Sequence, residues 1–343
     1  MCEKQISRII LLLLLIFATT HSVALEIEHD AVFVRVIDTG AGLATVTLMP
    51  GDHYMVYDAG HWNAEDLVME RIREIIPSGA TIDLLITSHN DSDHLGAVDE
   101  ILQEYRVTRV IRTGQVRDTN TYRDADSAIT RASTEQGTLD ISLDKFDFPD
   151  GATYRFGDAY ITKVTGFHEA PSTWDLISVA EKNNANSIVI RLFFKGKSIL
   201  FTGDAVGRHS GQENDVPLAT EKFMIENSPV ITIDSDVLIA PHHGADNASS
   251  SDFIKEVSPT WVIFSAGHDF GHPRKSTAER FLNQGVVIHR IFRTDLGDDE
   301  TGSEGQKEWK HNSISGHVDK KGDDDVDILI RPSGEIIVEY RNN

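Results

Sequence analysis

Residues 88–94, Ser-His-Asn-Asp-Ser-Asp-His, carry four side chains that can bind a metal ion: His89, Asp91, Asp93 and His94. Imidazole nitrogens and carboxylate oxygens are common protein ligands of divalent cations. In an extended turn, residues two positions apart point to the same side, so His89 and Asp91 can share one ion while Asp93 and His94 reach a neighbouring one. The spacing therefore predicts a two-metal site. A solvated acidic turn with incidental histidines is the alternative.

The segments on either side of this heptapeptide predict its place in the fold. Residues 82–87, Ile-Asp-Leu-Leu-Ile-Thr, have the length and apolar content of a buried strand. Residues 95–105 place apolar side chains at the spacing of a helix. We therefore expect the heptapeptide on a strand-to-helix turn, where side chains from neighbouring strands can converge.

Other strand ends along the chain carry residues of the same types. Asp58, Asp204 and the pair His242 and His243 each follow a short apolar run that predicts a strand. An aspartate at a strand end is common for turn reasons alone, so each segment by itself indicates little. Four strand ends with metal-binding residue types together favour one shared site.

Five motifs follow one another in a characteristic order. They are His-x-Asp-x-Asp-His (89–94), Asn-Asn-Ala-Asn-Ser-Ile-Val-Ile-Arg-Leu (183–192), Thr-Gly-Asp (202–204), Pro-His-His-Gly (241–244) and Gly-His-Pro (271–273). Together they resemble the metallo-β-lactamase superfamily, and within it the hydrolase domain of ComEC-type competence proteins. The resemblance implies an α/β fold, the αββα sandwich of that superfamily, with a dinuclear metal site at one edge of the sheets.

The resemblance also implies roles for the matching residues. His89 and Asp91 would bind the first metal, and Asp204 would bridge the two metals. Asp58 would orient a ligand by hydrogen bonds from just outside the metal sphere, where Asn183 is also expected.

The second metal, by the same resemblance, would take Asp93, His94 and His242. His243 either ligates in place of His242 or contacts the substrate, and the sequence leaves both open.

Two departures from the superfamily pattern bear on the choice of metal. Asp91 stands where most members carry a second histidine, and asparagines around Asn183 stand where they carry a third. The isolated His168 is an alternative source of that imidazole, although a lone histidine is more often a loop residue. Oxygen-rich sites favour harder cations, so we expect two divalent ions, with manganese competing with zinc.

The ligand set predicts a hydrolase in which a metal-bound hydroxide attacks the substrate. Asp93 would also orient the attacking group, and His272 would protonate or bind the leaving group; a plain turn before a helix at 276–282 explains His272 equally well. No Gly-x-Ser-x-Gly motif supplies a protein nucleophile. Phosphodiesters are the favoured substrates. Hydrolysis of small esters, lactones or β-lactams is one alternative, and a non-catalytic, metal-stabilised binding protein is another.

The N-terminus predicts the compartment. Lys4 and Arg8 precede an apolar run at 9–18, and small residues at 22–24 fit a signal-peptidase site. The run is shorter than the roughly 18 to 20 residues of a membrane span, so we expect a cleaved signal peptide at 1–24 rather than a stable anchor. The protein would be secreted or periplasmic, and Cys2 would leave with the peptide.

Charge limits the partners. The chain has 32 basic and 54 acidic residues, a net charge of −22. Non-specific DNA affinity comes mainly from basic side chains, so we expect a small-molecule or oligonucleotide phosphodiester as substrate and no tight binding of duplex DNA.

One hydrolase domain is expected over residues 25–343, with two special segments. Residues 106–150 show little periodicity and are expected to form a substrate-shaping insertion, whose arginines are either a solvated face or a phosphate-binding rim. Acidic residues gather near 295–327, which predicts a solvated insertion before a strand pair at 327–331 and 335–340.

Overall fold

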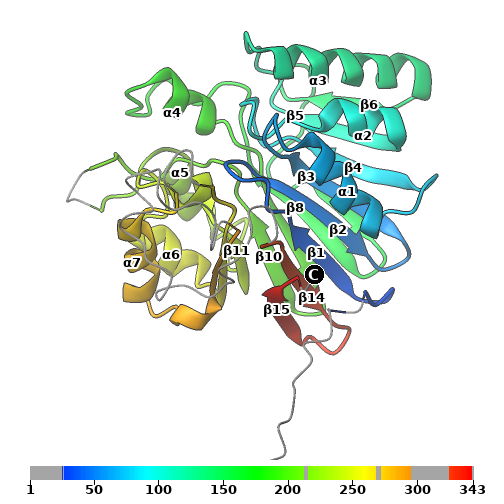
Figure 1. Ribbon diagram of the computed structural model, residues 1–343. Helices are drawn as coiled ribbons and strands as arrows, with labels where there is room; N and C mark the ends of the chain where they lie inside the picture. Colours follow the sequence, from blue (N-terminus) through cyan, green and yellow to red (C-terminus); the bar gives the residue numbers. More distant parts are fainter. Residues whose placement is uncertain (1–24, 26, 212–214, 268–271, 295–323, 342–343) are drawn as a thin grey trace, which may run out of the picture.

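The structure, a computed structural model, describes residues 25, 27–211, 215–267, 272–294 and 324–341. Two β-sheets pack face to face, with helices on both outer sides (Figure 1). This is the αββα sandwich expected from the sequence. The signal peptide expected at 1–24 lies outside the described residues, as does most of the acidic segment, at 295–323.

The first sheet has eight strands, which are antiparallel from β15 to β3 and parallel from β3 to β6. In spatial order they are β15 (Ile336–Tyr340), β14 (Val326–Ile330), β1 (Val32–Val36), β2 (Ala44–Met49), β3 (His53–Ala59), β4 (Thr81–Ile86), β5 (Arg106–Arg112) and β6 (Leu139–Ser142).

The second sheet has seven strands, parallel from β13 to β10 and antiparallel from β10 to β7. In spatial order they are β13 (Ile291–Arg293), β12 (Trp261–Phe264), β11 (Val237–Ile239), β10 (Lys197–Phe201), β9 (Val189–Phe194), β8 (Ala159–Thr165) and β7 (Thr153–Phe156).

Helices cover the outer faces because the strands are apolar on both sides, as parallel strands between layers must be. The first sheet is covered by α1, α2 and α3, and the second by α5, α6 and α7 (Figure 1). The helices are α1 (Glu65–Ile75), α2 (Val98–Glu104), α3 (Asn120–Arg131) with its π-helical end η1 (Ala132–Gln136), α4 (Val179–Asn184), α5 (Ala219–Asn227), η2 (Pro241–Gly244), α6 (Ser251–Val257), α7 (Lys275–Asn283) and η4 (Ile288–Arg290).

Residues 106–150 are not an insertion, contrary to the expectation from sequence. They form β5, α3 and β6, a unit that extends the first sheet. Their arginines do not form one rim either, because several are held by separate carboxylates. Arg112 is buried between Asp126 and Asp140, and Arg123 pairs with Asp118.

No helix in the described part of the chain is both long and apolar enough to cross a membrane.

The described end of the acidic segment, 324–327, is not solvated, which corrects the sequence-based expectation. Asp325 is fully buried, and its carboxylate accepts a hydrogen bond from Arg71 Nε at 2.6 Å. Asp327, 2% exposed, accepts two bonds from Arg35 on the neighbouring strand β1, at 2.7 and 2.8 Å. These carboxylates fasten the C-terminal hairpin to the sheet, because each meets a buried guanidinium.

We expect Asp327→Ala to lower the free energy of unfolding by about 3 to 5 kcal/mol, because it leaves the Arg35 charge buried without its main partner. Chemical denaturation measures the loss. Glu335→Ala is the matched control on the same hairpin, since it removes only the exposed pair with Arg331 and should change the free energy of unfolding far less. Equal losses in the two variants would contradict this account of the hairpin.

Candidate metal centre

The metal-binding residues predicted from sequence all follow the carboxyl ends of strands. Strands β3 and β4 are parallel neighbours in one sheet, and β10 and β11 are parallel neighbours in the other. The residues after them therefore emerge at the same edge of the sandwich, which is where α/β proteins usually bind ligands.

Asp204 lies at the centre of this group and is 3% exposed. Its Oδ1 is 3.2 Å from His94 Nε2 and 3.4 Å from His243 Nε2. Its Oδ2 is 3.8 Å from His89 Nε2 and 3.6 Å from His242 Nε2. The two oxygens of one carboxylate thus face two different pairs of imidazoles.

Two further carboxylates divide between these pairs. Asp91 Oδ2 is 3.5 Å from His89 Nε2. Asp93 Oδ2 is 3.9 Å from His94 Nε2 and 3.7 Å from His243 Nε2. One group of donors therefore contains His89 and Asp91, the other contains Asp93, His94 and His243, and the central carboxylate is shared.

Three of the imidazoles are oriented in the same way: the Nδ1 atom of each is hydrogen-bonded outward and its Nε2 atom faces the centre. Those Nε2 atoms and one central carboxylate oxygen are buried without a hydrogen bond in the described part of the chain. Metal-bound histidines characteristically hold their other ring nitrogen in this way. The donors present therefore fit divalent cations. The outward contacts are His89 Nδ1 to Ser88 Oγ (3.0 Å), His94 Nδ1 to Asp58 Oδ2 (2.8 Å) and His243 Nδ1 to the Ser265 carbonyl (2.7 Å).

Asp58 supports two of these histidines from behind. Besides the bond to His94, its carboxylate accepts Ser88 N at 2.6 Å and Ser88 Oγ at 2.7 Å. The Ser88 hydroxyl donates its one hydrogen to Asp58. Its oxygen can therefore only accept a hydrogen bond from His89 Nδ1. Asp58 is therefore placed to fix the direction of both rings.

We expect Asp58→Asn to weaken metal binding by about 10- to 100-fold, because the amide loses the charge that orients His94. Competition with a metal indicator dye measures the change. Asp83→Asn is a close control: Asp83 accepts Tyr54 N and lies 3.1 Å from His53 Nδ1 at the other end of β3. A similar loss of affinity in both variants would contradict a specific role for Asp58.

The structure separates His242 and His243, which the sequence could not. His243 faces Asp93, the place that the family resemblance gave to His242. His242 is 3.1 Å from the Asn184 amide, and its Nδ1 is 2.7 Å from Asn247 Oδ1. Both histidines have left-handed backbones, with φ values of 50° and 53°, which cost strain in residues other than glycine and are typical of functional sites. That backbone turns the two adjacent rings to different sides of the central carboxylate.

The electrostatics of the metal-free site follow from its crowding. Burial opposes the charged form of His94, but Asp204, Asp58 and Asp93 outweigh it and raise the pKa of His94 well above its usual value. Burial also opposes ionisation of Asp204, yet His243 and the other imidazoles hold its pKa well below its usual range. In the metal-free site the Asp204 carboxylate therefore stays negatively charged, and the His94 imidazole binds a proton tightly. A cation that binds His94 has to displace that proton.

His272 lies beside these residues rather than among the donors. Its ring stacks on His243 with centroids 6.5 Å apart and is 5.7 Å from the His242 ring. Burial, with help from the two neighbouring histidines, lowers the pKa of His272 well below its usual value. At neutral pH the His272 imidazole is therefore uncharged. In that form it can make a hydrogen bond to a substrate, but it carries no extra proton.

Two contacts on Asp91 were not expected from sequence. Arg117, from the loop after β5, approaches Asp91 Oδ1 to 2.5 Å. Asn184, with its amide oriented to satisfy both neighbours, donates to Asp91 Oδ2 at 3.1 Å and accepts from His242. Burial opposes ionisation of Asp91, but His89 and Arg117 outweigh it and lower its pKa. The arginines within residues 106–150 were visible in the sequence, but nothing there indicated that Arg117 would contact Asp91.

Asn183 and His168 take different positions. Asn183 is buried at the end of α4 next to Asp91, where the sequence placed it just outside the ligands. His168 instead directs its Nδ1 to the Thr113 carbonyl, 3.1 Å away. The groups of possible metal ligands among the described residues do not include His168.

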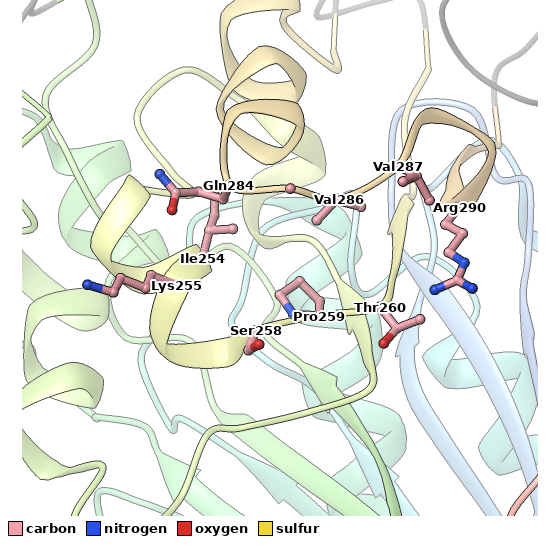
Figure 2. A pocket seen from close by; sticks show the side chains of 10 residues that line it. Ile254, Lys255, Ser258, Pro259, Thr260, Gln284, Val286, Val287 and Arg290 are labelled. Atoms are coloured by element: carbon pink, nitrogen blue, oxygen red, sulfur yellow. The ribbon is translucent and has the colours of Figure 1, made fainter.

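An open cavity of about 450 Å³ adjoins the centre and is lined by His242, His272, Arg274, Asn247 and Ser276. A second cavity, of about 340 Å³, lies between the ends of α6 and α7 (Figure 2). It is at the opposite end of β12 from the metal centre, and its lining residues include no histidine or carboxylate. The first cavity, unlike the second, therefore adjoins the site and is placed to admit a substrate.

The Lactamase_B family model, described as the Metallo-beta-lactamase superfamily, matches residues 39–268. The chain belongs to the metallo-beta-lactamase superfamily. Among the curated relatives of this superfamily member, ComE operon protein 3 of Bacillus subtilis (strain 168) is 28% identical over 221 residues, 62% of this chain and 24% of the relative. Competence protein ComA of Neisseria gonorrhoeae is 24% identical over 284 residues, 78% of this chain and 32% of the relative. The chain thus spans a quarter to a third of these relatives, which are ComEC-type competence proteins.

Solved structures of similar fold include Igni18, a metallo hydrolase from Ignicoccus hospitalis. It has a TM-score of 0.40 and 14% identity over 90% of this chain and all of that one. A metallo-beta-lactamase from Cronobacter sakazakii has a TM-score of 0.39 and 11% identity over 66% of this chain and 87% of that one. As a member of the superfamily, the present chain is a metal-dependent hydrolase.

Proposed function

We propose that this hydrolase is a phosphodiesterase of nuclease type that uses two divalent cations. The observation that carries the proposal is the donor set around His89: one imidazole and the carboxylates of Asp91 and Asp204, where the superfamily pattern has three imidazoles. Oxygen donors favour the harder cations that bind phosphate oxygens. The names of the relatives, which include a competence protein and Recombination protein 2 of Haemophilus influenzae, support a nucleic-acid substrate.

Cations held by these donors would activate water and polarise the phosphoryl oxygen. His89, Asp91 and Asp204 would hold one cation, and Asp93, His94 and His243 the other with Asp204 shared. His242, held between Asn184 and Asn247, would stand beside the first cation rather than bind it.

Other side chains would act on the substrate directly. Asp93 is more exposed than Asp204, so it is placed to accept a hydrogen bond from the attacking water. Arg274 and His272 line the cavity next to the centre and would meet the phosphate and the leaving oxygen. These roles are binding and orientation, with no covalent intermediate on the protein.

We also propose that the protein acts after secretion, in a periplasm or outside the cell. With a net charge of −22, we expect weak affinity for duplex DNA and action on small or single-stranded phosphodiesters.

We expect protein that has been chelated and refilled with Mn²⁺ to hydrolyse bis-p-nitrophenyl phosphate and single-stranded DNA, and Asp93→Ala to lose both activities. Asp158→Ala, which changes an exposed aspartate paired with Lys195, is the control and should remain active. Turnover of the β-lactam nitrocefin alone would move the protein to the alternative, hydrolysis of small esters, lactones or β-lactams. Silence on every substrate with metals bound would favour a non-catalytic binding protein.

A further inference from the structure

A cavity of about 340 Å³ lies between the loop after β5 and the loop that joins β8 to α4. This volume falls within the range of about 300 to 1,000 Å³ that small-molecule sites occupy. The roles proposed above do not use this cavity. Its walls include Gln115, Pro171, Trp174, Leu176, Lys182 and Asn186.

Short connections tie the cavity to the metal centre. The Gln115 carbonyl accepts a hydrogen bond from Asn90, inside the metal-binding heptapeptide. Arg117, two residues further on, pairs with Asp91. Asn186 Nδ2 donates to Gln115 Oε1 at 3.2 Å and closes the floor. The floor of this cavity is therefore joined by a hydrogen bond to the heptapeptide that carries the metal donors.

One wall is a tryptophan held in a fixed orientation. The Trp174 ring meets Phe167 edge-on at 5.1 Å and lies 6.2 Å from the Phe223 ring. Its backbone nitrogen donates to the Pro171 carbonyl at 2.9 Å. Because the indole is ordered before a ligand arrives, stacking on it costs little conformational entropy.

The floor is made of amides and is selective for a polar edge. Both ends of the Asn186 side chain are used: Oδ1 accepts Ala170 N at 2.6 Å, and Nδ2 donates to Gln115. Gln115 Nε2 makes no hydrogen bond among the described residues and remains a donor at the floor. A purely apolar group would bury this donor unpaired, which disfavours an alkyl chain or a benzyl group as the occupant.

The rim is almost neutral. Exposed Lys182 and Glu169 stand on it with opposite charges. On a protein with a net charge of −22, the affinity for a nucleotide must come largely from uncharged contacts such as stacking.

We propose that this cavity binds one unpaired nucleobase of the substrate. Trp174 stacks on the face of the base, and Gln115 reads its hydrogen-bonding edge. The inference rests on the proposed phosphodiesterase function and narrows its substrates to nucleotides with an unpaired base, as in single-stranded nucleic acid or a dinucleotide.

The test measures binding without catalysis. Calorimetric titration of the metal-chelated full chain with thymidine and 2′-deoxyadenosine should detect binding, and 2-deoxyribose 5-phosphate should not bind. Trp174→Ala should weaken nucleoside binding by at least about tenfold, and Trp174→Phe should largely restore it. Gln115→Ala should change the preference between the two nucleosides.

Trp62→Ala is the matched control, because Trp62 is an exposed tryptophan that contacts the His61 ring and does not line this cavity. Unchanged binding by Trp174→Ala with a normal melting temperature, or binding of the sugar phosphate alone, would overturn the proposal. If nucleosides fail to bind while bis-p-nitrophenyl phosphate is hydrolysed, the cavity assignment is wrong and the phosphodiesterase function stands. If nucleosides bind while no phosphodiester is cleaved, the cavity assignment stands and the phosphodiesterase function is wrong.

Discussion

Asp204→Asn is expected to reduce metal-dependent hydrolysis by more than about 100-fold. Loss of a residue that only orients a ligand already costs about 10- to 100-fold, and Asp204 approaches donors of both groups. Its oxygens lie 3.2 to 3.8 Å from four imidazole Nε2 atoms. The amide keeps the shape of the side chain but offers one weaker acceptor and no charge, so neither cation would be held in place. Steady-state hydrolysis and metal content, measured together, check the expectation.

Asp236→Asn is the matched control for this variant. Asp236 directly precedes β11, accepts hydrogen bonds from Lys197 and the Ser198 backbone nitrogen, and lies at the opposite end of β10 and β11 from Asp204. It should keep full activity and both metals. Normal activity and metal content in Asp204→Asn would exclude a bridging role for this carboxylate.

The sequence was most informative where function depends on local structure. The heptapeptide at 88–94 sits between β4 and α2 as its flanking periodicity predicted, because an apolar strand followed by a helical pattern is a local signal. Asp58 likewise lies at the end of β3, and Asp204 follows β10 within a few residues. The αββα order could be anticipated for the same reason, together with the family resemblance.

Side-chain partners across the fold could not be predicted in the same way. Whether His242 or His243 faces Asp93 depends on two left-handed residues and on the Ser265 carbonyl, which belongs to another strand end. The acidic residues near the C-terminus looked solvated because composition records charge but not partners. Arg35 and Asp327 are 292 positions apart in the chain yet adjacent in the sheet.

Removal of metal is expected to destabilise the folded protein strongly. Asp91, Asp93 and Asp204 converge with Asp58 behind them, and bound cations would offset this concentrated negative charge. A ligand present at about 100 times its Kd stabilises the native state by about 2.7 kcal/mol, which corresponds to about 4 °C in Tm for a protein of this size. Two occupied sites would exceed that. Thermal unfolding with Mn²⁺, and again with chelator, measures the difference.

The same experiment has a predicted pH dependence. The pKa of His94 is raised in the metal-free fold, so its protonation stabilises that fold at low pH, and this contribution is lost as the pH rises through the raised pKa. Metal binding needs the imidazole neutral, so protons compete with the cation and the gain in Tm on adding Mn²⁺ should be larger at pH 8 than at pH 6. Asp204→Asn should show little gain at either pH. A gain that is equal at both pH values, or equal in the variant, would place the stabilising cation elsewhere on the protein.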